Sequence, residues 1–126
     1  MKKYIFPALL LLFIGCAKKE APAPPALTPS ETVLKVCDAL SRHDSAAYVN
    51  LVSSTRRRSY ATNPKLLNMT LSFWMMRKPK IQIISESQHD TTAMVKYHLT
   101  ISGTPPIDLI DSTQLVLEDG AWKYAR

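Results

Sequence analysis

The sequence predicts an α+β domain in which N-terminal helices pack on a curved antiparallel sheet of about four strands. Between residues 28 and 78, apolar side chains recur at the three- to four-residue spacing of amphipathic helices. From residue 81 onward they alternate with polar side chains, which is the period of a half-buried strand. An Asp-Gly pair at residues 119 and 120 favours a two-residue hairpin turn. Helices followed by antiparallel strands indicate a helical layer over one face of a sheet.

The first helix is predicted to begin at Pro29, because proline suits the first position of a helix. Thr28 can cap this helix, and Glu31 lies at the spacing of a capping box. Apolar side chains then follow at i, i+3, i+4 and i+7, and these are Val33, Val36, Cys37 and Leu40. We expect this stripe to face the core.

Two further helices are predicted from their starting residues. Asp44 can cap a second helix that runs to about Val52, and Asn63 with Pro64 begins a third that ends near Lys78. The expected buried faces are Ala47, Tyr48, Leu51 and Val52 in the second helix, and Leu66, Leu67, Thr70, Leu71 and Trp74 in the third.

The strands are predicted from alternation between turns. The clearest strand covers residues 93–101, where Ala93, Val95, Tyr97, Leu99 and Ile101 alternate with polar or mixed neighbours. A strand from residue 81 precedes it, residues 107–118 follow with an expected bulge, and residues 121–125 form the last strand.

Two stretches of the predicted domain resemble a known family. Residues 31–34 and 38–44, followed by Tyr48 and Leu51, are similar to the first helices of nuclear-transport-factor-two-like domains, which share a cystatin-like fold. Residues 115–124 are similar to the final hairpin of the same domains. The resemblance covers most of residues 29–126. It implies a cone-shaped domain with a pocket between helices and sheet, which serves as an enzyme, a ligand binder or a scaffold.

Residues 1–15 have the features of an export signal. Lys2 and Lys3 are followed by an apolar run at residues 5–14, and a run of ten is shorter than the ~20 helical residues that cross a membrane. The run ends in a glycine and Cys16, which resembles the lipobox of bacterial lipoproteins. That resemblance implies cleavage before Cys16 and a diacylglycerol lipid on its sulfur. The alternatives are an ordinary secreted protein and an uncleaved membrane anchor.

Residues 16–27 are predicted to be a lipid-bearing tether in front of the domain of residues 28–126. Four of the nine prolines lie between residues 22 and 29, and they favour an extended polyproline II chain. Eleven such residues reach roughly 34 Å. A docking site for a proline-binding module is the rival interpretation. Ala17 stands where an aspartate would retain such lipoproteins at the inner membrane, so we expect an outer-membrane location facing the periplasm; a cell with a single membrane is the alternative.

Nucleic acid is not expected as a partner, although the chain carries a net charge of +6. Without Lys2 and Lys3 the charge falls to +4, and residues 28–126 carry only +3. The most basic stretch is Arg56, Arg57 and Arg58, and no aromatic side chains alternate with it. These arginines are a candidate anion contact. The alternative is a solvated end of a helix, where arginine suits the helix dipole.

An apolar stretch near the end of the third helix is a candidate ligand or partner surface. It consists of Phe73, Trp74, Met75 and Met76, which make the helix apolar on every side. The sheet can bury only one side. A helix wedged between two layers is the alternative.

The sequence shows no catalytic or metal-binding motif. His43, His89 and His98 share no ligand spacing, so no metal or cofactor is expected. Cys37 lies on an apolar stripe, which favours a buried inert thiol over a reactive or intermolecularly bridged one. The four residues conceivable in a catalytic pocket, which no spacing selects, are Tyr48, Tyr97, Asp108 and Asp111.

These features together favour a lipid-anchored bacterial envelope protein whose domain is a non-enzymatic binding module. The expected partners are the membrane, through the lipid on Cys16, and an envelope protein or small apolar ligand. The alternative is a small pocket enzyme of the isomerase or hydratase type.

Overall fold

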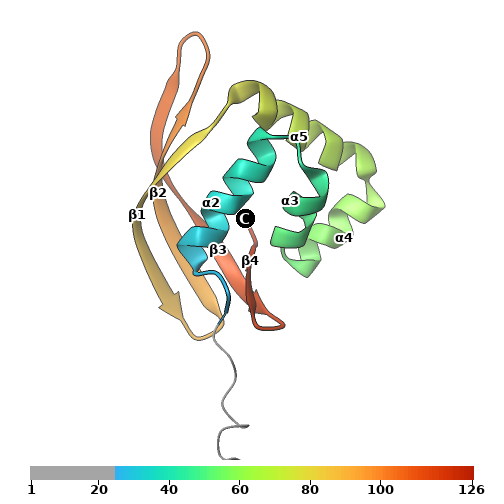
Figure 1. Cartoon of the computed structure of the whole chain (residues 1–126), viewed down its shortest axis with the longest axis vertical. Coiled ribbons are helices and arrows are strands. Elements are labelled where there is room, and N and C mark those ends of the chain that lie inside the picture. The colour runs from blue at the N-terminus through green and yellow to red at the C-terminus, as the bar shows by residue number, and fades with distance from the viewer. Residues whose placement is uncertain (1–24) are drawn as a thin grey trace, which may run out of the picture.

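Residues 25–126 are described by a computed structural model (Figure 1). The predicted signal of residues 1–15 and the lipid site at Cys16 lie outside these residues. The helices are α2 (Pro29–Ser41), α3 (Ser45–Leu51), α4 (Ser54–Thr62) and α5 (Pro64–Arg77). The strands are β1 (Lys80–His89), β2 (Thr92–Ile101), β3 (Ile107–Glu118) and β4 (Ala121–Tyr124). The predicted α+β order is confirmed. None of the described helices has the length and apolar character needed to cross a membrane.

The four strands form one antiparallel sheet in the order β1-β2-β3-β4. Figure 1 shows the sheet curving around α2, while α3, α4 and α5 lie beyond it. The β3–β4 turn is the predicted two-residue hairpin, in which Asp119 and Gly120 both have positive φ.

The expected bulge is in β1, not in residues 107–118. The register between β1 and β2 shifts between Ile83 and Ser85, whereas β2 and β3 pair without a shift. Since β1 is an edge strand, an extra residue there interrupts the hydrogen bonds on one side only. A bulge in β3 would interrupt pairing with both of its neighbours.

The predicted starts of α2 and α3 are confirmed. The Thr28 hydroxyl accepts a hydrogen bond from the Glu31 backbone N–H at 3.1 Å, and the Glu31 carboxylate accepts one from the Thr28 N–H at 2.9 Å. Asp44 caps α3 by accepting a hydrogen bond from the Ala47 N–H at 3.1 Å. Local sequence therefore determines where both helices begin.

Helix α4 was not predicted, because it has no apolar period: Tyr60 is its buried side chain. The chain leaves α3 at Val52, which is fully buried and forms a parallel bridge with Tyr124 of β4. Ser53 then caps α4. The Glu118 carboxylate of β3 accepts hydrogen bonds from the Ser54 N–H at 3.0 and 3.2 Å and from its hydroxyl at 3.0 Å. The start of α4 thus depends on the sheet.

The buried side chains form two clusters that meet at α2. One joins the four helices through Val36, Ala39, Leu40, Tyr48, Val52, Tyr60 and Leu71. The other joins α2 to the sheet through Val33, Ala93, Val95, Leu115 and Trp122.

The buried face predicted for α5 needs one correction. Leu71 is buried and Leu67 and Trp74 pack beside it, but Leu66 is 41% exposed. The residues at positions 67, 71 and 74 follow one line along the helix, and Leu66 lies about 100° around from it. This position turns Leu66 toward the surface between α4 and α5.

Candidate functional site

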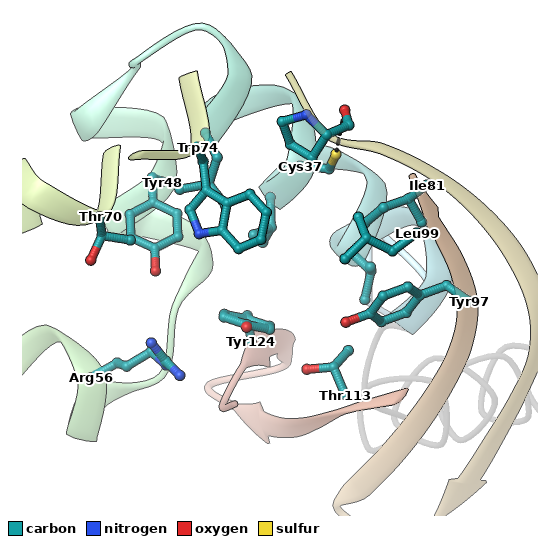
Figure 2. A pocket seen from close by; sticks show the side chains of 14 residues that line it. Cys37, Tyr48, Arg56, Thr70, Trp74, Ile81, Tyr97, Leu99, Thr113 and Tyr124 are labelled. Carbon is teal, nitrogen blue, oxygen red and sulfur yellow. Dashed lines mark hydrogen bonds between the residues drawn. The ribbon is translucent and has the colours of Figure 1, made fainter. Parts of the chain in front are cut away.

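A cavity of about 110 Å³ lies between the helices and the concave face of the sheet (Figure 2). An apolar protein cavity of about 150 Å³ can hold benzene. The cavity is therefore of a size for a compact small molecule and too small for a long-chain lipid.

Most of the cavity wall is apolar. Helix α2 provides one side of it, the first two strands provide another, and Trp74 of α5 closes the space between them (Figure 2). These apolar and weakly polar lining residues are Val33, Val36, Cys37, Leu40, Trp74, Pro79, Ile81 and Leu99.

The polar part of the wall is built around Arg56 of α4. Its Nε donates to the Ala125 carbonyl at 3.0 Å, and its Nη1 donates to the Tyr60 hydroxyl at 3.3 Å. The guanidinium lies 4.9 Å from the centroid of the Tyr124 ring, within the range of a cation–π contact. The Tyr60 hydroxyl is also 2.7 Å from the Tyr48 hydroxyl. Two tyrosines and the last strand thus hold this arginine in place.

The remaining polar lining residues are Thr70, Tyr97 and Thr113. Figure 2 shows the Tyr97 hydroxyl directed into the open space, opposite Arg56. Thr113 donates its hydroxyl hydrogen to the Arg126 carbonyl, so that hydrogen is already used. Polar groups therefore reach the cavity from both the helices and the sheet.

The tyrosines at the cavity are poor acids. Burial, followed by the negative charge of Asp111, raises the pKa of Tyr97 to about 12. Burial, followed by the hydrogen bond with Tyr60, raises the pKa of Tyr48. Burial works against the charge of Arg56, but the Tyr60 hydrogen bond and the nearby tyrosines outweigh it and raise the pKa of Arg56. At neutral pH these groups are hydrogen-bond donors and one fixed cation.

Cys37 was expected in the core, and the structure places it at the cavity wall, partly buried. Its Sγ is 3.6 Å from the Pro79 carbonyl oxygen. Burial raises the pKa of the thiol, and Asp38 adds to the increase while Ser41 opposes it. The thiol is therefore less ionised than an exposed one.

The three consecutive arginines lie in the first half of α4, not at the end of a helix as the alternative interpretation expected. Only Arg56 faces the cavity. Arg57 donates to the Val52 carbonyl at 2.7 Å and lies 3.7 Å from the Glu118 carboxylate. Arg58 is exposed on the surface. The three arginines of the candidate anion contact therefore lie in three different environments.

The four apolar residues at positions 73–76 of α5 also lie in different environments. Trp74 lines the cavity, and its ring meets Phe73 edge-on at 5.1 Å. Phe73, Met75 and Met76 are exposed to different degrees, and Met76 is the most exposed at 74%. The structure does not bring these four side chains together on one surface.

The carboxylates considered for catalysis and the three histidines do not line the cavity, although Asp111 is paired with Tyr97 between β3 and β2. Asp108 pairs with His98, which is on the face of the sheet opposite the helices, as predicted. Asp111 is exposed and accepts a hydrogen bond from the Ser112 N–H. The cavity lining, all of it within the described part of the chain, has no carboxylate and no imidazole. Residues 25–126 also hold no group of three His, Cys, Asp or Glu side chains suited to a metal.

Several lining residues were missed by the sequence analysis. Thr70, Thr113 and Tyr124 come from three different elements, and no spacing along the chain connects them. A tyrosine on a predicted buried face was the available signal, because its hydroxyl must reach a polar partner or water. Tyr48 and Tyr97 both carried that signal.

Comparison with known proteins identifies the fold. No protein-family model and no curated protein matches the chain. A SEC-C motif containing protein from Rhodopseudomonas palustris has a TM-score of 0.56 at 15% identity, over 71% of this chain and 68% of that one. A protein from Campylobacter jejuni described as an NTF2-like transpeptidase has a TM-score of 0.55 at 12% identity, over 79% and 99%.

An uncharacterized cystatin fold protein from Novosphingobium aromaticivorans has a TM-score of 0.42 at 14% identity, over 80% of this chain and 100% of that one. At such identities a likeness shows the fold and not the activity. The NTF2-like protein from Campylobacter jejuni, at a TM-score of 0.55, therefore shows a shared α+β fold and no more.

Proposed function

We propose that this protein is a lipid-anchored component of a bacterial envelope and that its domain binds a small apolar ligand in the cavity. The observation that carries the binding role is the cavity wall itself. It is mainly apolar and has a few convergent polar groups, which is the composition of small-molecule sites. The volume of about 110 Å³ limits the ligand to a compact body, about as large as one aromatic ring.

Binding is favoured over isomerase or hydratase chemistry by the groups in the wall. Such reactions need a side chain that accepts a proton near neutral pH. The lining offers tyrosines, threonines, one cysteine and one arginine, and burial raises the pKa of Tyr97 to about 12 and also raises the pKa of Cys37. These groups donate hydrogen bonds and orient a ligand, and none of them is a base at pH 7.

Ligand binding is tested with benzene, a compact apolar probe. We expect benzene to raise the thermal unfolding midpoint of the wild-type chain, because a ligand that binds only the folded state stabilises it. It is also expected to change the fluorescence of Trp74 in the cavity wall. Cys37→Phe fills the cavity and should abolish both responses.

Leu34→Phe is the matched control for this experiment. Leu34 is on the same helix and is 42% exposed, outside the cavity lining. This variant should respond to benzene as the wild type does. An equal response in all three proteins, or no response in the wild type, would contradict the proposal.

Anchoring is supported by residues 1–16, which combine a basic start, an apolar run and a lipobox-like cysteine. Two or more acyl chains give stable membrane attachment. We expect Cys16→Ser to release the protein from the membrane fraction or to leave it as the uncleaved precursor. The measurement is membrane fractionation with the mass of the product. Mature-size Cys16→Ser protein in the membrane fraction would show that lipid on Cys16 is not the anchor.

A further inference from the structure

The Arg56 side chain is a cation whose hydrogen-bonding capacity is only partly used. A guanidinium has five N–H donors. The hydrogen bonds of Arg56 within the described residues use two of them, to the Ala125 carbonyl and the Tyr60 hydroxyl. No carboxylate of residues 25–126 forms an ion pair with it. Three N–H groups and the positive charge of Arg56 therefore remain available to a ligand.

Arg56 lines the cavity and also a neighbouring surface pocket that includes Thr55 and Ser59. Figure 2 shows the guanidinium at the polar end of the cavity, with the Tyr48 and Tyr97 hydroxyls also directed toward the open space. The Tyr97 and Tyr124 hydroxyls have no hydrogen-bond partner among the described residues. The apolar side chains of Ile81 and Leu99 lie across the open space from Arg56 (Figure 2).

We infer that the natural ligand is a small monocarboxylate, whose carboxylate pairs with Arg56 while its compact apolar body lies between α2 and the sheet. This inference rests on the proposed binding function and specifies the chemical class of the ligand. An arginine matches a carboxylate in geometry, since its planar fork can donate two parallel hydrogen bonds.

The charge of the site favours a carboxylate over a phosphate. Among residues 25–126, Arg56 is the only charged residue in the lining, and the other oxygen-bearing side chains there are neutral hydroxyls. Arg56 can therefore neutralise one negative charge of a ligand in the cavity. A second charge on a phosphate would be partly buried without a partner, which is costly.

The experiment is isothermal titration calorimetry of the full chain with benzoate, benzamide, benzene and inorganic phosphate at pH 7. Benzamide has the shape of benzoate without its charge. We expect benzoate to bind more tightly than benzamide, and phosphate not to bind. Arg56→Gln should weaken benzoate binding by about 10- to 100-fold, the usual range for loss of a charge-assisted hydrogen bond. It should weaken benzamide binding much less, because a hydrogen bond to a neutral carbonyl contributes less than one to a carboxylate.

Arg58→Gln is the matched control, because it removes the same charge from the same helix at an exposed position outside the cavity lining. It should bind benzoate as the wild type does. Circular dichroism and urea unfolding check that Arg56→Gln folds. If that variant does not fold, the comparison of benzoate with benzamide on the wild type decides the inference.

Failure of the inference differs from failure of the proposed function. If benzene binds and benzoate does not, or if benzamide equals benzoate, the cavity binds apolar ligands and the carboxylate inference is wrong. Phosphate binding as tight as that of benzoate, or Arg56→Gln binding benzoate like the wild type, also overturns it. If none of the probes binds, the proposed binding function fails as well.

Discussion

Tyr48 connects the stability of the domain to its cavity. Its side chain is almost completely buried in the helical cluster, yet its hydroxyl lies at the cavity edge, 2.7 Å from the Tyr60 hydroxyl. Arg56 donates a hydrogen bond to the Tyr60 hydroxyl, so that hydroxyl can donate its own hydrogen bond to Tyr48. In that arrangement the Tyr48 hydrogen is free to face a ligand. One chain of three side chains then orders the polar end of the cavity.

Leu71 and Met76 lie on the same helix and should differ sharply in their effect on stability. Leu71 is 1% exposed and Met76 is 74% exposed. Leu71→Ala leaves a hole in the helical cluster, and we expect it to lower the free energy of unfolding by about 2–5 kcal/mol. Met76→Asp replaces an exposed side chain in the last turn of α5, where the helix dipole disfavours aspartate, and should lower it by no more than about 1 kcal/mol.

Urea unfolding of the two variants and the wild type measures this difference. Comparable losses in both variants would show that Met76 is covered by another part of the protein or by a second molecule. That result would revive the interpretation of residues 73–76 as a partner surface.

The sequence predicts the environment of single residues only in part. The pattern of apolar residues identifies a helix face to within about a quarter turn, which was enough for Leu71 and not for Leu66. Consecutive side chains on a helix point about 100° apart. Arg56, Arg57 and Arg58 therefore reach a cavity, a carbonyl and solvent, and only tertiary structure shows which arginine reaches which.

At the level of elements, the start of α2 is held by the sheet as well as by its own capping box. The Glu86 carboxylate of β1 accepts hydrogen bonds from the Ser30 N–H at 2.9 Å and from the Ser30 hydroxyl at 2.6 Å. Partial burial works against this charge, but the hydrogen bonds from Ser30 and Gln88 outweigh it and lower the pKa of Glu86. A carboxylate also suits the positive end of the helix dipole.

We expect Glu86→Gln to lower the free energy of unfolding at pH 7 by about 0.5–1 kcal/mol, the lower part of the range for an exposed helix cap. The pKa of Glu86 is lower in the folded state than in the unfolded state. Its stabilising contribution is therefore complete above its ordinary pKa of 4.5 and is lost as the pH falls through the folded value.

Urea unfolding at several pH values measures this prediction. The difference between wild type and Glu86→Gln should be constant from pH 7 to about pH 5 and should shrink at lower pH. Asp111→Asn is the control, because Asp111 is exposed and accepts its hydrogen bond from the next residue in the chain. A difference that does not change with pH would mean that the charge of Glu86 has no part in the cap.

The order of elements could be predicted because their signals are local. Thr28, Asp44 and the 119–120 turn each act within a few residues, and the structure confirms all three. Helix α4 was not predicted, because it has no apolar period and part of its N-terminal capping comes from Glu118 of β3. The cavity was beyond prediction for the same reason: its walls come from several elements that meet only in the folded domain.

At the level of the whole molecule, the cavity lies where the two buried clusters meet. Val33 belongs to the cluster on the sheet and Val36 to the cluster among the helices, and both line the cavity. A ligand there contacts both halves of the core at once. Its binding energy therefore stabilises the domain as one unit, which is why thermal unfolding is an appropriate measurement of occupancy.

The two carboxylates that reach from the sheet to the helices also determine when the chain can finish folding. Glu86 meets Ser30 across 56 residues, and Glu118 meets Ser54 across 64. Contacts between such distant residues form late, because closing a long loop costs entropy. A ribosome releases the chain from its N-terminus. Residue 118 follows the whole of α4 in the chain, so the first turn of α4 gains these contacts only after β3 has been synthesised.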